Sequence, residues 1–307
     1  MEGWFRAFEQ RGLVVADGPG WRRAGAPDGA PGTRGISLFM VPKYIPDESG
    51  KPGVGNSLKV VSLEHKLGIH GSPTCVMSFE GATGWLVGQE HKGMAAMFTM
   101  MNNARLAVGM QGVAVAEAAL QHAAAYATER HQMGAIVRHA DVRRMLATGR
   151  AEVFAARAIC LACAQALDMA TATGDADWQA RAAFLTPIAK AFMTEVGFEA
   201  ASHGMQIYGG HGFISEWGME QNVRDSRISC LYEGTTGIQA LDLMGRKIVG
   251  SGGSYYRHFA DEINAFIASA DASLAEFTGP LQAAVKNLDE LTAWVLERAK
   301  ANPNEIG

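Results

Sequence analysis

The stretch that decides the fold is MAAMFTMMNNARLAVGMQGVAVAEAALQHAAAYATER, residues 94–130. Alanine, methionine and leucine dominate it, and the expected breaks fall only at Gly109 and Gly112. Because these residue types favour helices, the stretch predicts a long helix from Met94 to Arg130. Further helices are predicted at 141–173 with Asp141 as cap, at 177–207 with a kink or restart at Pro187, at 219–227 and at 235–249. Long helices with short links predict a helical bundle.

The pattern differs on either side of this bundle. Short apolar runs closed by Gly or Pro predict strands at 36–41, 58–63 and 75–79, whereas 18–34 is rich in Gly, Pro, Ala and Arg and reads as a loop. Downstream, 250–254 predicts a hinge, and 255–277 and 280–300 predict amphipathic helices. We therefore predict a mainly α fold in four parts: an irregular segment 1–33, a small β-segment 34–92, a helical bundle 93–250, and a further pair of helices 251–307.

Composition excludes several classes of protein. The 307 residues are 48% hydrophobic and carry a net charge of −4, which disfavours binding to nucleic acid through a basic surface. No uncharged apolar run reaches the ~18 residues of a membrane span, and the first residues lack the apolar core of a signal peptide. Four cysteines are too few for a disulfide scaffold, so we expect a reduced, cytoplasmic location. His65 and His70 lack metal-ligand spacing, and no metal site is predicted.

The densest polar segment is VRDSRISCLYEGTTGIQ, residues 223–239. Thr235 or Thr236 can cap the helix that follows, and free N–H groups at a helix start favour an anion such as a phosphate. Glu233 follows Leu231 and Tyr232, so partial loss of water would raise its pKa and suit it to act as a general base. An ordinary capping acid is the alternative interpretation.

Two other segments have both a functional and a plain interpretation. YGGHGF, residues 208–213, allows the backbone to approach a ligand closely, but it is equally a tight turn between helices. No strand precedes it, so it is not a dinucleotide-binding fingerprint. ERHQMG, residues 129–134, closes the long helix and is otherwise a solvated helix end.

In combination these segments resemble the acyl-CoA dehydrogenase family. LYEGTTGIQ (231–239), preceded by QIYGGHGF (206–213), is similar to the family's carboxy-terminal signature, and YATERHQMG (126–134) to its YA-x-ER-x-x-x-G motif. KLGIHGS (66–72) and TMMNNARL (99–106) resemble the large subgroup that includes the 3-methylmercaptopropionyl-CoA dehydrogenases and has an extra carboxy-terminal helical domain. The resemblance extends from about Gly32 to Val249. It implies that 34–92 is the remainder of a β-domain, a partial β-domain, and that 251–307 is the start of the extra helical domain.

The resemblance assigns roles residue by residue. It makes Glu233 the catalytic base, because Asn103, at the position some members use for the base, is not a carboxylate. It makes Arg105 the active-site arginine that helps to position the base loop. The FAD contacts that it implies are Arg130, Gln132 and Met133 after the long helix, Gln206, Gly209 and Gly210 near the adenosine, and Thr235 at the pyrophosphate. Met133 stands where the family usually has Phe, and Gly237, where many members have Gln, is not assigned.

The implied reaction is the FAD-dependent α,β-dehydrogenation of an acyl-CoA thioester, with electrons passing to an electron-transferring flavoprotein and with FAD sites shared in a homo-oligomer. An acyl-CoA oxidase that uses O2 is one alternative, and a catalytically inactive, truncated helical assembly module is another. The family's amino-terminal helical domain has no counterpart in residues 1–33. We therefore expect the chain to be a fragment of a longer protein.

Overall fold

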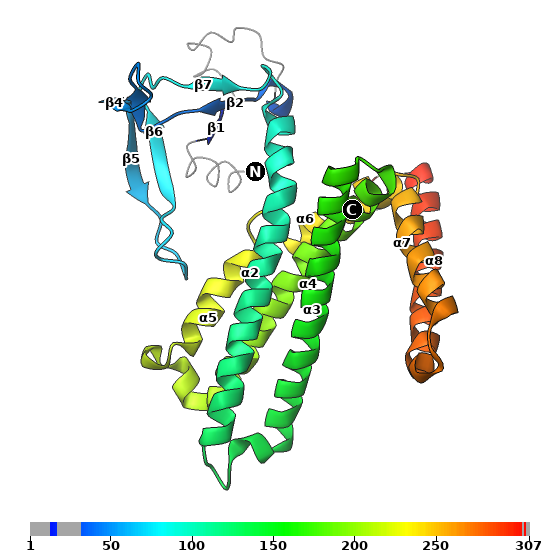
Figure 1. Ribbon diagram of the computed structural model, residues 1–307. Helices are drawn as coiled ribbons and strands as arrows, with labels where there is room; N and C mark the ends of the chain where they lie inside the picture. The colour runs from blue at the N-terminus through cyan, green and yellow to red at the C-terminus, as the bar shows by residue number, and fades with distance from the viewer. Residues whose placement is uncertain (1–12, 17–31, 303, 305–307) are drawn as a thin grey trace. The chain divides into compact units, whose positions relative to one another are not determined.

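The computed structural model describes residues 13–16, 32–302 and 304 (Figure 1). The chain divides into two compact units, Met1–Ala104 and Arg105–Gly307. The predicted class, helices with a small β-region, is confirmed. The four predicted domain boundaries stay predictions, because this two-way division is coarser than they are.

The first unit contains short antiparallel strands and the beginning of a long helix. Three strands pair in the order β1-β2-β7, and two further pairs are β3–β4 and β5–β6. Their bounds are Leu13–Ala16 (β1), Ser37–Met40 (β2), Tyr44–Pro46 (β3), Pro52–Gly55 (β4), Leu58–Leu63 (β5), Cys75–Phe79 (β6) and Trp85–Val87 (β7). The three predicted strands match β2, β5 and β6. Strand β1 lies in the segment predicted to be irregular, most of which is outside the described residues.

A small core joins the strands of this unit to the helix. Helix α2 (Gly93–Glu129) begins so close to β2 that a Cβ on Gly93 would lie 2.6 Å from the carbonyl carbon of Ser37. Ile36 and Leu38 then pack with Met97 and Met101 of α2. Burial of these side chains supplies the apolar contact that an isolated small sheet lacks.

The second unit is helical throughout its described residues. It contains the rest of α2, then α3 (Ala140–Thr173), α4 (Ala176–Tyr208), α5 (Met219–Ser226), α6 (Thr236–Leu241), the π-helical segment η7 (Asp242–Val249), α7 (Ser254–Ser269) and α8 (Ala275–Ala301). Short 3-10 turns link them, among them η4 (Gly209–Phe213) and η6 (Arg227–Cys230). Helices α3 and α4 run side by side in Figure 1, and α7 pairs with α8.

Gly109 and Gly112 do not break α2, contrary to the sequence prediction. A Cβ on Gly112 would lie 2.2 Å from the Met193 carbonyl oxygen, and one on Gly197 would lie 2.6 Å from the Gly112 Cα atom. The backbones of α2 and α4 therefore touch at this crossing, which only glycine permits. Met193, Val196 and Phe184 of α4 belong to the main core of this unit.

Other helix ends differ from the predictions. Asp141 lies inside the first turn of α3, where it pairs with Arg144, and His139 occupies the cap position without a side-chain cap. Helix α4 continues through Pro187 without a restart, and Asp175 caps it by accepting the N–H of Asp177 at 2.8 Å.

The last predicted turn is also misplaced. The chain leaves α7 at Ala270, where Asp271 accepts the N–H of Ser273, and α8 begins at Ala275 and contains Pro280. The sequence predicts the second helix from Pro280, but α8 begins five residues earlier.

Among the helices in the described part of the chain, α3 is the one whose length and composition would allow it to cross a membrane. A core helix of a protein without membrane spans satisfies the same test. Val153, Ala156 and Cys163 of α3 are buried in the core of the second unit. The predicted absence of a membrane span stays a prediction.

Candidate active site

The turn that carries Glu233 lies between η6 and α6, and its backbone is sharply bent. Glu233 has a φ of 55° and Gly234 a φ of 95°, so two consecutive residues adopt left-handed conformations. This conformation is uncommon for a residue with a side chain, and it persists where surrounding contacts enforce it. The Glu233 side chain is half-buried.

Buried polar groups provide those contacts. The Lys190 ammonium, on α4, donates to the carbonyl oxygens of Ser229 at 2.8 Å and Gly234 at 2.7 Å. The Gln239 side-chain amide donates to the carbonyl oxygens of Glu233 at 3.3 Å and Gly234 at 3.2 Å. Lys190 and Gln239 therefore fix the backbone on both sides of the Glu233 carboxylate. Residues 229–239 are called the base loop below.

Helix α4 also contacts the base loop at two further points. The Thr236 hydroxyl donates to the Glu195 carboxylate at 2.7 Å, and the Cys230 thiol donates to the Thr194 carbonyl oxygen at 3.4 Å. Thr235 caps α6, since its hydroxyl oxygen accepts the N–H of Ile238 at 3.3 Å. The prediction that Thr235 or Thr236 caps this helix is confirmed for Thr235.

Helix α2 contacts both the base loop and the segment that follows it. The Tyr232 hydroxyl donates to the side-chain oxygen of Gln111, and burial raises the pKa of the Tyr232 phenol. Arg105 pairs with Asp242 at 2.8 Å, and both side chains are 3% exposed. Because Asp242 begins η7, directly after α6, this ion pair ties the end of the base-loop helix to α2. Arg246 also approaches Asp242, at 3.4 Å.

The other predicted residues lie at a different end of the helices. Arg130, Gln132 and Met133 form an exposed turn after α2, in which Met133 is 96% exposed and has a φ of 53°. The turn is closed by a hydrogen bond from the Ile136 N–H to the Arg130 carbonyl oxygen at 2.9 Å. The side chains of Arg130 and Gln132 are exposed.

An aromatic cluster brings Gln206, Gly209 and Gly210 next to this end of α2. The Tyr126 ring stacks on that of Tyr208 at 4.0 Å, and its hydroxyl lies 2.9 Å from His211 Nδ1. Gly209 has a φ of 59°, and a Cβ on Gly209 or Gly210 would meet nothing within 4 Å, so the backbone there is open to a ligand.

Gly212 has a purely structural part in the same turn. A Cβ on Gly212 would lie 2.3 Å from the Met205 carbonyl oxygen. The tight-turn interpretation of the 208–213 segment therefore applies to Gly212, and the ligand interpretation stays a prediction for Gly209 and Gly210.

The two groups of predicted residues lie far apart along the helices. From Arg105 to Arg130 is 25 residues, and from Lys190 to Tyr208 on α4 is 18 residues. At 1.5 Å per residue these are about 37 Å and about 27 Å. The structure therefore brings Glu233, Arg105 and Thr235 together at one end, and Arg130, Gln132, Met133, Gln206, Gly209 and Gly210 at the other.

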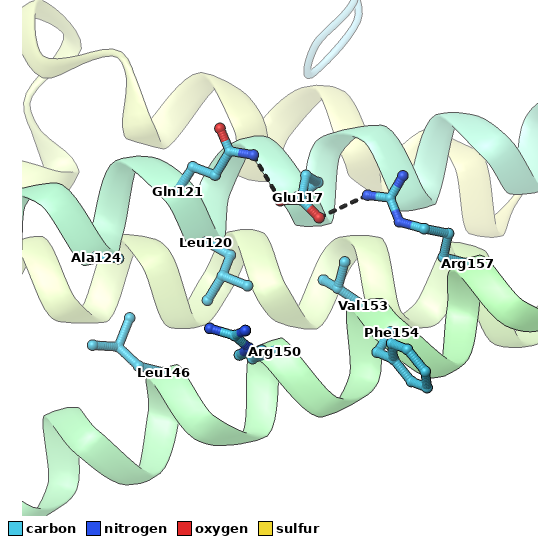
Figure 2. Close-up of a pocket in the computed structure, with 9 residues that line it drawn as sticks. All are labelled: Glu117, Leu120, Gln121, Ala124, Leu146, Arg150, Val153, Phe154 and Arg157. Carbon is cyan, nitrogen blue, oxygen red and sulfur yellow. Dashed lines mark hydrogen bonds and ion pairs between the residues drawn. The ribbon is translucent and has the colours of Figure 1, made fainter.

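A groove of about 480 Å³ lies between α2 and α3, apart from every predicted site residue. Figure 2 shows the Glu117 carboxylate between the side chains of Gln121 and Arg157, which donate to it at 2.7 and 2.8 Å. Phe154 and Arg150 face the same groove from α3.

The chemistry of the second group fits the phosphate and adenosine parts of FAD. Arg130 and Gln132 supply exposed N–H donors for an anion, and the open Gly209–Gly210 backbone permits close approach. In the first group, beside Glu233, the Thr235 hydroxyl accepts from Ile238 and keeps its own proton to donate. Among the described residues, no three His, Cys, Asp or Glu side chains are grouped as metal ligands.

Sequence reasoning missed Lys190, Gln239 and Asp242 as parts of this site. Lys190 is preceded by the apolar stretch AFLTPIA and followed by Ala191 and Phe192, and a lysine in such surroundings is the signal that could have found it. The pairing of Arg105 with Asp242 spans 137 positions of sequence and left no local signal.

Comparison with known proteins identifies the family. The model of the acyl-CoA dehydrogenase carboxy-terminal domain matches residues 91–248. The 3-methylmercaptopropionyl-CoA dehydrogenase of Ruegeria pomeroyi is 46% identical over 283 residues, which are 88% of this chain and 47% of that protein. A broad-specificity linear acyl-CoA dehydrogenase of Mycobacterium tuberculosis is 37% identical over 79% of this chain and 44% of its own length. The chain thus spans about half the length of these curated relatives.

Solved structures agree with the fold. Caenorhabditis elegans ACDH-11, crystallised in complex with C11-CoA, superposes with a TM-score of 0.83 at 22% identity, over 94% of this chain and 48% of that one. Butyryl-CoA dehydrogenase from Megasphaera elsdenii gives a TM-score of 0.60 at 26% identity, over 71% and 53% of the two chains. As the motifs around Glu233 and Arg130 indicated, the chain belongs to the acyl-CoA dehydrogenase family.

Proposed function

We propose that this chain supplies the catalytic base and part of the FAD site of an enzyme that dehydrogenates acyl-CoA thioesters between their α and β carbons. The observation that carries the proposal is the base loop: Glu233 is the carboxylate of the family signature, and buried groups fix its strained backbone. The names of the relatives support the substrate class, as does the C11-CoA bound to ACDH-11.

Glu233 is the group that removes the proton from the α carbon. A carboxylate is a weak base, so it works here only if it is held within hydrogen-bond reach of that carbon's proton and if the thioester carbonyl is polarised by donors. The hydrogen bonds from Lys190 and Gln239 hold the loop through backbone carbonyl oxygens. Bound FAD would supply the acceptor for the β-hydrogen and its electron pair, and Thr235 and the Arg130 end are the residues that would hold it.

Arg105 and Asp242 have a supporting role in this proposal. Their buried ion pair fixes the start of η7 against α2, so α6 and the base loop keep their position relative to the helix bundle. Thr235, beside the base, is placed to donate to the pyrophosphate.

We further propose that the enzyme is a homo-oligomer with shared FAD sites. Arg130 is separated from Arg105 by about 37 Å of helix, which is too far for both to serve one flavin and its substrate. The Arg130 end, with Gln132, Gln206, Gly209 and Gly210, therefore serves the cofactor of a neighbouring subunit. An electron-transferring flavoprotein is the proposed electron acceptor, and one structural neighbour belongs to an electron-transferring flavoprotein of Acidaminococcus fermentans.

The test is Glu233→Gln in the full-length, FAD-loaded protein. Gln keeps the shape of Glu but cannot accept the proton, so reduction of the flavin by acyl-CoA should slow by at least about 10²–10⁴-fold while FAD stays bound. Stopped-flow bleaching of the flavin near 450 nm measures this. Rapid bleaching in the variant would refute the assignment of Glu233. Reoxidation of the reduced enzyme with and without O2 separates a dehydrogenase from an oxidase.

A further inference from the structure

The proposed function uses the hydrogen bonds of Lys190 but does not explain why a lysine is buried there. Lys190 is 0% exposed, and it lies on α4 between the core residues Ala189 and Met193. Lysine is almost never fully buried unless its charge is compensated, because transfer of an ammonium from water to the interior is costly. A buried lysine in the middle of a core helix therefore needs an explanation.

The contacts of Lys190 converge on the turn at Glu233. Its ammonium donates to the carbonyl oxygens of Ser229, four residues before Glu233, and of Gly234, the residue immediately after it. The single Lys190 ammonium therefore connects the backbone before Glu233 to the backbone after it. Carbonyl dipoles aimed at an ammonium form charge-assisted hydrogen bonds, which are about twice as strong as neutral ones.

The electrostatic surroundings of Lys190 also connect it to Glu233. Burial lowers the pKa of its ammonium to about 8, while the nearby Cys230, Glu195 and Glu233 act to raise it and Arg105 to lower it. Glu233 is therefore close enough to interact electrostatically with the cation. Lys190 consequently acts on Glu233 through the backbone that carries it, and its charge also attracts the carboxylate.

We propose that Lys190 is a positioning residue for Glu233, whose buried ammonium holds the base loop in the conformation that presents the carboxylate to the substrate. This inference rests on the proposed role of Glu233 as base. Methionine at position 190 would fill a similar volume at a lower desolvation cost but would leave the Ser229 carbonyl oxygen without this donor.

The test compares Lys190→Met with two variants in the full-length protein. Thr186→Val is the matched control, because Thr186 is buried on the same helix one turn earlier and donates to the Ala182 carbonyl oxygen rather than to the base loop. Glu233→Gln tests the proposed function in parallel. We expect Lys190→Met to lower kcat by about 10²-fold, the loss that a misplacement of about 1 Å causes, with KM for acyl-CoA changed less than about twofold.

A second measurement does not depend on activity. In the protein without cofactor, amide hydrogen exchange should become at least about tenfold faster at Leu231, Tyr232 and Gln239 in Lys190→Met but not in Thr186→Val. The N–H groups of Leu231 and Tyr232 donate to the Ile228 carbonyl oxygen, and that of Gln239 donates to the Thr235 carbonyl oxygen. Unchanged exchange at these amides, or equal acceleration in Thr186→Val, would overturn the proposal. So would an unchanged kcat in Lys190→Met when Glu233→Gln is inactive. Activity in Glu233→Gln would instead refute the proposed function and leave exchange to decide whether Lys190 holds the loop.

Discussion

The two ends of the helical bundle that carry the site residues are built in opposite ways. Around Glu233 the polar groups are buried and bonded to one another within the chain, through Lys190, Gln239 and the Arg105–Asp242 pair. Around Arg130 the polar side chains are exposed, and the Gly209–Gly210 backbone is open. The difference suggests that the first end holds its catalytic group unaided, whereas the second is shaped to meet a molecule outside this chain.

The largest expected effect concerns the buried ion pair at the first end. Asp242→Leu leaves Arg105 buried without its carboxylate, and breaking such a pair from one side costs about 3–5 kcal/mol of unfolding free energy. Chemical denaturation followed by circular dichroism measures the loss. The control is Asp141→Leu, whose partner Arg144 is exposed, and which should cost less than about 1 kcal/mol. Equal losses in the two variants would show that the first end is not held by its buried charges.

The next effect is a dependence of stability on pH that comes from Lys190. Its pKa falls from 10.5 to about 8 on folding, so between these values the unfolded chain binds more protons and stability rises with pH. Below pH 8 the full cost of the buried charge, about 3 kcal/mol, is present. Relative to Lys190→Met, the wild-type protein should therefore gain about 2 kcal/mol between pH 8 and pH 9.5.

Denaturation curves at several pH values measure this difference. Lys286→Met is the control, because Lys286 is exposed on α8 and that variant should follow the wild-type curve. A wild-type curve parallel to that of Lys190→Met would contradict the burial of a charged lysine.

An effect of similar size, on cofactor binding and not on stability, is expected at the second end. Arg130→Ala removes an exposed cation that we assign to the FAD pyrophosphate of a neighbouring subunit, and a hydrogen bond to a charged group contributes about 1.5–3 kcal/mol. FAD retention during gel filtration should fall, while the free energy of unfolding of the apoprotein stays within about 0.5 kcal/mol. Arg143→Ala, another exposed arginine, is the control. A monomer with full FAD occupancy would remove the basis for a shared site.

The sequence predicts the helices well, but it predicts poorly where they begin and where they contact one another. Periodicity and composition placed α2, α3 and α4 within one or two residues, because long helices are specified by local preference. Gly109 and Gly112 were read as breaks, since the sequence alone does not distinguish a glycine that ends a helix from one that admits a neighbouring backbone. Asp141, which the sequence predicts as a cap, lies inside the first turn of α3.

The candidate site shows the same limit. Glu233 was found through a local motif, but its left-handed backbone and its supports on α4 depend on contacts between distant segments. Lys190 and Gln239 lie 43 residues before and 6 residues after it, and no local pattern signals that their side chains meet the same carbonyl oxygen. The residues of the second end were found by resemblance, and their roles stay predictions.

The smallest expected effect sharpens the comparison within the base loop itself. Thr235→Val removes the hydroxyl that accepts the Ile238 N–H, and loss of such a cap costs about 1 kcal/mol. Thr235→Ser retains the hydroxyl and should restore the stability. If the hydroxyl also donates to the pyrophosphate, Thr235→Val weakens FAD binding beyond what this loss of stability explains. Titration of the apoprotein with FAD, beside thermal unfolding without FAD, separates the two roles: equal FAD affinity in Thr235→Val and Thr235→Ser would limit Thr235 to capping α6.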